Sequence, residues 1–158
     1  MTDSAGDARR YSFRLLSYRG RSERELIEKL EKKGFSAEII SATAEYLKKA
    51  GFLDDRALAL NLRRQALEQK LLGHSGARLL LLKRGIPGEI IDATLDYDED
   101  AEARNLQKLV DKKLRSVGNY LSDRDKKKLW NFLARRGYSF SIIKKTLKDM
   151  RMHEEVCE

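Results

Sequence analysis

A segment that recurs three times along the chain constrains its fold more than any other feature. Each copy reads leucine, any residue, two basic residues, glycine, a large apolar residue, serine or proline, two further residues and two isoleucines. The glycines of the three copies are Gly34, Gly85 and Gly137, which lie 51 and 52 residues apart. A period of this length indicates a stack of similar structural units, each built on the same local plan.

The recurring segment has the chemistry of a helix, a tight turn and a second helix. Basic side chains at the end of a helix complement the negative end of its dipole, and a glycine in the left-handed conformation closes the helix. Ser36 and Ser139 are suited to cap the following helix, and Pro87 is suited to its first turn. The paired isoleucines then begin the buried face of the second helix.

We expect one more helix before each of these pairs. Apolar residues follow helical spacing over residues 8–19, 55–72 and 101–117. No segment shows the alternating pattern of a strand. The sequence therefore predicts an all-α fold of three tandem three-helix repeats, about nine helices, elongated and curved. The predicted repeats are residues 1–53 with a short disordered N-terminus, residues 54–97, and residues 98–158 with a short acidic tail.

Composition excludes several classes of protein. Of the 158 residues 37% are charged, and no apolar run approaches the roughly 18 residues that a membrane span needs. The polar first ten residues do not resemble a secretory signal. The single cysteine, Cys157, cannot form an internal disulfide, which suits a reducing compartment. We expect a cytoplasmic protein that acts as a monomer and does not contact membranes.

No motif for catalysis or metal binding is present in the sequence. The two histidines, His74 and His153, and the single cysteine do not have the spacing of metal ligands. Acidic residues at 54–55 and 96–100 precede predicted helices, where helix capping and dipole compensation explain them better than an acid/base pair or a metal cluster. Residues 73–76, which we expect in a loop between two predicted helices, match the GXXG loop of KH domains, but those domains need a sheet. We expect no enzymatic activity, no metal and no cofactor.

The charge of the chain, +8 overall, is concentrated in its last third. Residues 103–151 include 15 basic and 4 acidic residues, a local net charge of +11. Such a field attracts polyanions, namely nucleic acid, an acidic protein surface or an anionic membrane. A surface that only keeps the protein soluble would have a similar composition. Contact with a polyanion is favoured because Asp149 is the only acid between residues 126 and 151, whereas ordinary surface helices mix both signs.

The basic residues of the last two predicted helices form stripes opposite the apolar positions. Arg124, Lys128 and Arg135 share one stripe, and Lys144, Lys148 and Arg151 share the other. The candidate residues for contact with DNA or a nucleoprotein filament are Arg63, Arg64, Arg124, Lys127, Lys128, Arg135, Arg136, Lys144, Lys145, Lys148 and Arg151. Trp130 lies among them and could stack on a base, but it borders the apolar face, which favours packing in the core. The basic pair before each glycine either compensates the helix dipole or forms an evenly spaced basic series.

The sequence resembles the RecX family. Residues 22–35 and 51–55, the latter reading Gly-Phe-Leu-Asp-Asp, are similar to the first part of that family. Residues 83–86 and 135–139 are similar to its second and third repeats, and the resemblance runs from about residue 8 to residue 151. The resemblance implies three tandem three-helix repeats. Members often carry a basic loop before the fifth helix; residues 71–76 hold no lysine or arginine, so the third repeat is the better candidate for DNA contact.

RecX proteins are bacterial regulators of the RecA recombinase. The resemblance implies a non-enzymatic regulator that binds the RecA–DNA filament, lodges in its groove and lowers recombinase, ATPase and coprotease activity in DNA repair, recombination and the SOS response. The implied partners are the RecA filament and the phosphate backbone of single-stranded and duplex DNA. The residues alone also allow a sequence-independent DNA-binding helical module. Base reading is disfavoured because the third, sixth and ninth predicted helices begin with apolar or acidic residues.

Overall fold

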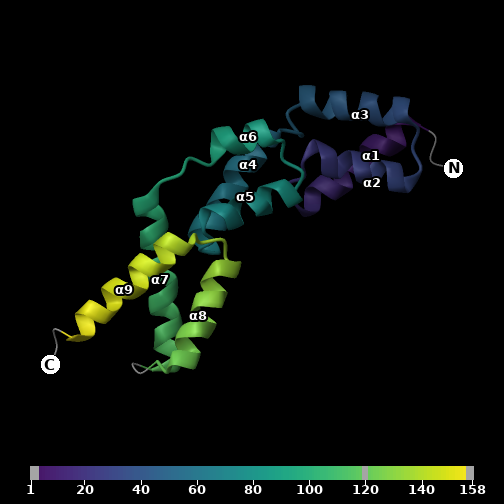
Figure 1. Ribbon diagram of the computed structural model, residues 1–158. Helices are drawn as coiled ribbons and strands as arrows, with labels where there is room; N and C mark the ends of the chain where they lie inside the picture. The colour runs from purple at the N-terminus through teal and green to yellow at the C-terminus, as the bar shows by residue number, and fades with distance from the viewer. Residues whose placement is uncertain (1–3, 119–120, 156–158) are drawn as a thin grey trace. The chain divides into compact units, whose positions relative to one another are not determined.

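Over the residues that the structure describes, the chain folds into α-helices and contains no strand (Figure 1). The structure is a computed structural model that describes residues 4–118 and 121–155, with side chains as far as Asp149. The helices are α1 (Ala5–Tyr18), α2 (Glu23–Lys33), α3 (Ala37–Lys49), α4 (Asp55–Arg64), α5 (His74–Lys83), α6 (Gly88–Thr94), α7 (Glu99–Val117), α8 (Asp123–Arg135) and α9 (Phe140–Glu155). A π-helical segment, η1 (Gln65–Gln69), continues α4. The predicted all-α fold is confirmed. Parts of the expected N-terminus and acidic tail lie outside the described residues.

The predicted helix ends of the recurring segment are confirmed. Gly34, Gly85 and Gly137 have φ angles of 94°, 75° and 88°, which is the left-handed conformation that glycine adopts most readily. The hydroxyl oxygens of Ser36 and Ser139 each accept a hydrogen bond, at 3.4 Å, from the backbone N–H three residues later. A left-handed glycine therefore closes the helix in all three copies, and a serine caps the following helix in the first and third.

Three elements differ from the boundaries that the sequence predicts. The first helix begins at Ala5, ahead of the expected residue 8, because the Ser4 hydroxyl accepts from the N–H of Asp7 at 3.1 Å and caps it. The fourth helix widens into η1, where the N–H of Lys70 donates to the carbonyl of Gln65 at 2.9 Å. The helical segment therefore ends at Gln69, before the expected residue 72. Residues 74–76, expected in a loop, form the first turn of α5.

The chain packs into two compact units. The first unit comprises Met1–Leu62 and Leu81–Thr94, and the second comprises Arg63–Leu80 and Leu95–Glu158. One core of the first unit is built on α1, α2 and α3, with Leu26, Leu30 and Leu47 fully buried. In the second unit α7, α8 and α9 bury a separate core. The boundaries of the three repeats stay a prediction.

Within the first unit, the turn at Gly85 packs against the start of α2. The Arg84 guanidinium donates from Nε to Glu25 Oε1 at 2.9 Å and from Nη2 to the carbonyl of Gly20 at 2.8 Å. A Cβ on Gly85 would lie 2.7 Å from Ser22 Oγ, so only glycine lets the turn approach this closely. Arg84, the second basic residue before Gly85, therefore joins its own helix pair to α2.

Within the second unit, the turn at Gly137 packs against the start of α5 in the same way. The N–H of Gly73 donates to the carbonyl of Arg136 at 2.9 Å. A Cβ on Gly137 would collide with the backbone of Gly76. The hydroxyl of Tyr138, in a ring that is only 4% exposed, donates to the carbonyl of Leu71 at 2.7 Å. This joint fixes the helix pair α8–α9, which carries the candidate site, to α5.

Candidate nucleic-acid interface

The sequence positions the basic residues of α8 through a cap and an apolar stripe. Ser122 and Asp125 form a reciprocal capping box, with the Ser122 hydroxyl accepting from the N–H of Asp125 at 3.2 Å. Leu129 and Leu133 are 8% and 0% exposed, which fixes the rotation of the helix. As a result Arg124, Lys127, Lys128 and Arg135 are exposed to solvent.

The buried face of α9 is equally well defined. Ile142 and Ile143 are 2% and 1% exposed, as the repeat pattern predicts. Lys144, Lys145 and Lys148 are exposed, and Lys145 Nζ lies 3.7 Å from Glu99 Oε1 of α7. We call the exposed basic residues of the two helices the α8–α9 basic surface: Arg124, Lys127, Lys128, Arg135, Lys144, Lys145 and Lys148.

The remaining predicted contact residues have different surroundings. Arg63 and Arg64 are exposed at the end of α4, outside the α8–α9 pair. Arg136 is half-buried, donates from Nη1 to the carbonyl of Lys70 at 2.8 Å, and lies 5.2 Å from the centre of the Phe132 ring. Its charge is therefore engaged inside the second unit. Arg151 is in α9, but its side chain lies outside the described residues.

Asp125, in the first turn of α8, has a pKa below its ordinary value. Hydrogen bonds from the Ser122 side chain and backbone lower the pKa of Asp125, and the nearby Lys128 and Arg124 lower it further. Its position in the first turn of α8 also complements the helix dipole. The carboxylate is thus used to cap the helix and offsets only a small part of the local positive charge.

Comparison with known proteins identifies the family. The sequence matches the family models for the RecX first three-helix domain over residues 8–47 and the RecX third three-helix domain over residues 100–147. It is 34% identical over 138 residues to the regulatory protein RecX of Chlorobaculum tepidum, a match that spans 87% of this chain and 84% of that one. The chain belongs to the RecX family. The regulatory protein RecX of Chlorobium limicola is 32% identical over 155 residues, which span 98% and 96% of the two chains.

Solved structures of RecX proteins share the fold. The crystal structure of RecX from Lactobacillus salivarius has a TM-score of 0.78 at 20% identity, with 94% of this chain and 97% of that one covered. A second crystal structure, of a regulatory protein RecX, has a TM-score of 0.74 at 25% identity and covers 91% and 71% of the two chains. The predicted repeat fold of the RecX family is confirmed.

The GXXG-like segment of this RecX-family chain is not a nucleic-acid clamp. Residues 73–76 lie in and before the first turn of α5, where the N–H of His74 donates to Glu102 Oε1 at 2.9 Å. A Cβ on Gly73 would lie 2.5 Å from the backbone of Gly137 and Tyr138. Protein fills the space that a nucleic-acid backbone would need. This agrees with the sequence, which disfavours a KH-type clamp because no sheet is predicted.

Asp54 and Asp98, two of the acidic residues considered for a metal, are helix caps. Asp54 Oδ1 accepts from the N–H groups of Arg56 and Ala57 at 3.0 and 3.1 Å, and Asp98 Oδ1 accepts from that of Ala101 at 3.0 Å. In the part of the chain that the structure describes, no three His, Cys, Asp or Glu side chains are grouped so that they could hold a metal ion. The described helices also include none with the length and hydropathy to cross a membrane.

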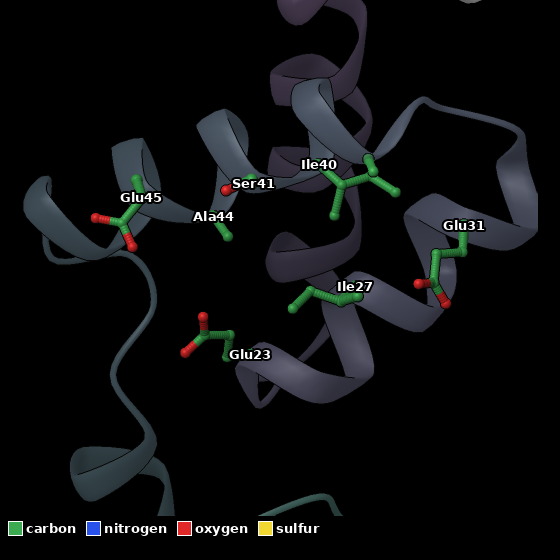
Figure 2. A pocket seen from close by; sticks show the side chains of 8 residues that line it. Glu23, Ile27, Glu31, Ile40, Ser41, Ala44 and Glu45 are labelled. Carbon is green, nitrogen blue, oxygen red and sulfur yellow. The ribbon is translucent and has the colours of Figure 1, made fainter.

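A groove of the first unit has the opposite charge. It lies between α2 and α3, has a volume of about 260 Å³, and has Ile27 and Ile40 among its lining residues (Figure 2). Three glutamates also line it, and Lys48 Nζ lies 3.0 Å from Glu23 Oε1 and 3.2 Å from Glu45 Oε1. Carboxylates repel a polyanion, so this groove is a poor site for nucleic acid.

Proposed function

We propose that this chain regulates the RecA recombinase by binding the RecA nucleoprotein filament, and that it does so without catalysing a reaction. The observation that supports this most strongly is membership of the RecX family over nearly the whole chain. The resemblance implies that binding blocks extension of the filament or favours its disassembly. Recombinase, ATPase and coprotease activities of RecA would all fall, since each depends on the assembled filament.

The α8–α9 basic surface supplies the contact with DNA in this proposal. Its side chains are exposed, while the core residues Leu129, Leu133, Ile142 and Ile143 of the same helices are buried and unavailable to a partner. Lysine and arginine bind phosphates by charge, which fixes position on the strand but carries no sequence information. Both single-stranded and duplex DNA should therefore bind, with little preference for sequence and a strong dependence on salt.

The assay that tests the proposal is the ATPase activity of RecA on single-stranded DNA with substoichiometric protein added. We expect strong inhibition by the wild-type chain and much weaker inhibition by the double variant Lys144→Glu, Lys148→Glu. The matched control is Lys29→Glu, Lys32→Glu, which reverses two exposed lysines of the first unit. An ATPase rate unchanged at equimolar protein would rule out the regulator and leave the alternative, a sequence-independent DNA-binding helical module acting in the cytoplasm as a monomer.

A further inference from the structure

The third repeat differs from the first at one particular surface. The recurring segments align with a constant offset of 103 residues, because Gly34 corresponds to Gly137. The residues that line the groove between α2 and α3 in the first unit then correspond to positions on α8 and α9 in the second. At these positions Lys126, Trp130, Phe140, Lys144 and Lys148 replace Glu23, Ile27, Ala37, Ser41 and Glu45. Two glutamates and a serine are replaced by lysines, and an isoleucine and an alanine are replaced by aromatic residues.

The two aromatic side chains form a pair at the surface. The ring centroids of Trp130 and Phe140 are 4.9 Å apart and their planes are inclined by 63°. Trp130 is half-buried and packs against the core of the second unit, so the expected core packing accounts for one part of this ring. Phe140 is 68% exposed, and the other repeats have alanine and glycine, Ala37 and Gly88, at its position. Burial therefore does not explain why a phenylalanine is present.

Three lysines share the helix faces of the aromatic pair. Lys126 precedes Trp130 by four residues, Lys144 follows Phe140 by four, and Lys148 lies one turn further along α9, so helical spacing places them on the same faces as the rings. Among the described side chains, none of these lysines is ion-paired with an acid. Unpaired cations beside accessible aromatic rings are the combination that binds single-stranded nucleic acid.

We propose that Trp130 and Phe140 form a stacking site for an unpaired base of single-stranded nucleic acid, with Lys126, Lys144 and Lys148 holding the flanking phosphates. This inference rests on the DNA contact in the proposed function. It adds that the third repeat binds an unpaired base as well as phosphates. A strand is favoured over an acidic protein because its planar bases match the rings while its phosphates match the lysines. A single exposed apolar residue is common on protein surfaces; what distinguishes this one is its aromatic neighbour and the three cations.

The single tryptophan of the chain, Trp130, reports on this site directly. The experiment titrates the protein with two oligonucleotides of equal length, one of thymidines and one with abasic positions throughout. We expect the thymidine strand to quench Trp130 fluorescence and the abasic strand to bind with much less quenching. The Phe140→Ala variant should bind the thymidine strand about fivefold or more weakly, the loss typical of one stacked base, and should bind the abasic strand as wild type does. Binding of the variant is followed by the anisotropy of labelled strands.

The matched control is Phe52→Ala. Phe52 is 55% exposed, and its ring centroid lies 4.9 Å from that of Phe13, so it is a similar aromatic pair in the first unit. This control should leave both affinities unchanged. Phe140 is at the surface, so a melting curve close to that of wild type is expected to show that the variant folds.

Several outcomes would overturn the stacking site. Equal affinity of Phe140→Ala and wild type for the thymidine strand would do so, and so would an equal loss for both strands. Loss of binding to RecA without DNA, with DNA affinity intact, would instead assign the aromatic pair to a protein contact. If wild type binds neither strand, the DNA contact of the proposed function fails together with the stacking site; every other negative outcome leaves that contact standing.

Discussion

Replacing the glycine of the three equivalent turns by alanine should cost very different amounts of stability. All three glycines have positive φ angles, so each alanine meets a strain of about 1 kcal/mol, partly offset by about 0.4–1 kcal/mol from the less flexible unfolded chain. A Cβ on Gly34 would meet nothing within 4 Å. For Gly34→Ala we therefore expect a loss of about 1 kcal/mol or less.

The other two turns add steric overlap to that strain. A Cβ on Gly85 would lie 2.7 Å from Ser22 Oγ, which caps α2, and 3.1 Å from the Cβ of Arg24, a less severe overlap than at Gly137. A Cβ on Gly137 would overlap the backbone of Gly76, which cannot move without disturbing the first turn of α5. Overpacking of this kind costs about 1–3 kcal/mol and occasionally more. We expect a total loss of about 3 kcal/mol or more for Gly137→Ala, with Gly85→Ala between the other two.

Thermal unfolding measures the difference. At about 2–4 °C per kcal/mol for a chain of this size, Gly137→Ala should lower Tm by about 6–12 °C, and Gly34→Ala by about 4 °C at most. Circular dichroism follows all helices, whereas Trp130 fluorescence follows the second unit, where the Gly137 turn lies. Equal losses at Gly34 and Gly137 would refute the reasoning, since they would show that the packing of the turns contributes nothing beyond the strained φ angle.

Three further predictions concern charge. The Lys144→Glu, Lys148→Glu variant should bind DNA roughly tenfold or more weakly than wild type, because two attractions become two repulsions; Lys29→Glu, Lys32→Glu should change affinity less, and equal losses in a binding titration would indicate a diffuse field. The affinity for single-stranded DNA should fall with salt with a log–log slope of about −0.7 per phosphate contact, and an affinity that does not change with salt would contradict phosphate binding. Burial raises the pKa of Glu25, but hydrogen bonds from Arg84 and the Ser22 backbone outweigh it, so the pKa lies below its ordinary value. That stabilisation is present above the unfolded pKa of about 4.3 and is lost as pH falls through the lower folded value; melting curves of Glu25→Gln should therefore show a smaller acid-induced loss than wild type.

The helices could be predicted from the sequence because their signals are local. Glycine, the basic pair before it and the capping serine act within a few residues, so the ends at Gly34 and Ser36 follow from the pattern alone. The joints between repeats do not follow from the pattern. The pattern predicts a loop at residues 74–76, where α5 begins, because nothing nearby in the sequence shows that the Gly137 turn packs against this segment.

The candidate site was predicted in part. Opposite apolar and basic stripes predict the exposure of Lys144 and Lys148, which the structure shows. The engagement of Arg136 could not be predicted, since its partner, the carbonyl of Lys70, is remote in sequence. The exposed ring of Phe140 was missed, although comparison of the three copies carries a signal, because the first two have a small residue at that place.

Cosedimentation with preformed RecA filaments on single-stranded DNA tests the central claim most directly. The claim is that this chain acts on the assembled filament through its third repeat. The account predicts that wild type sediments with the filaments, that Lys144→Glu, Lys148→Glu remains largely in the supernatant, and that Lys29→Glu, Lys32→Glu behaves as wild type. Wild-type protein that stays in the supernatant, or a charge-reversed third repeat that sediments as well as wild type, would contradict it.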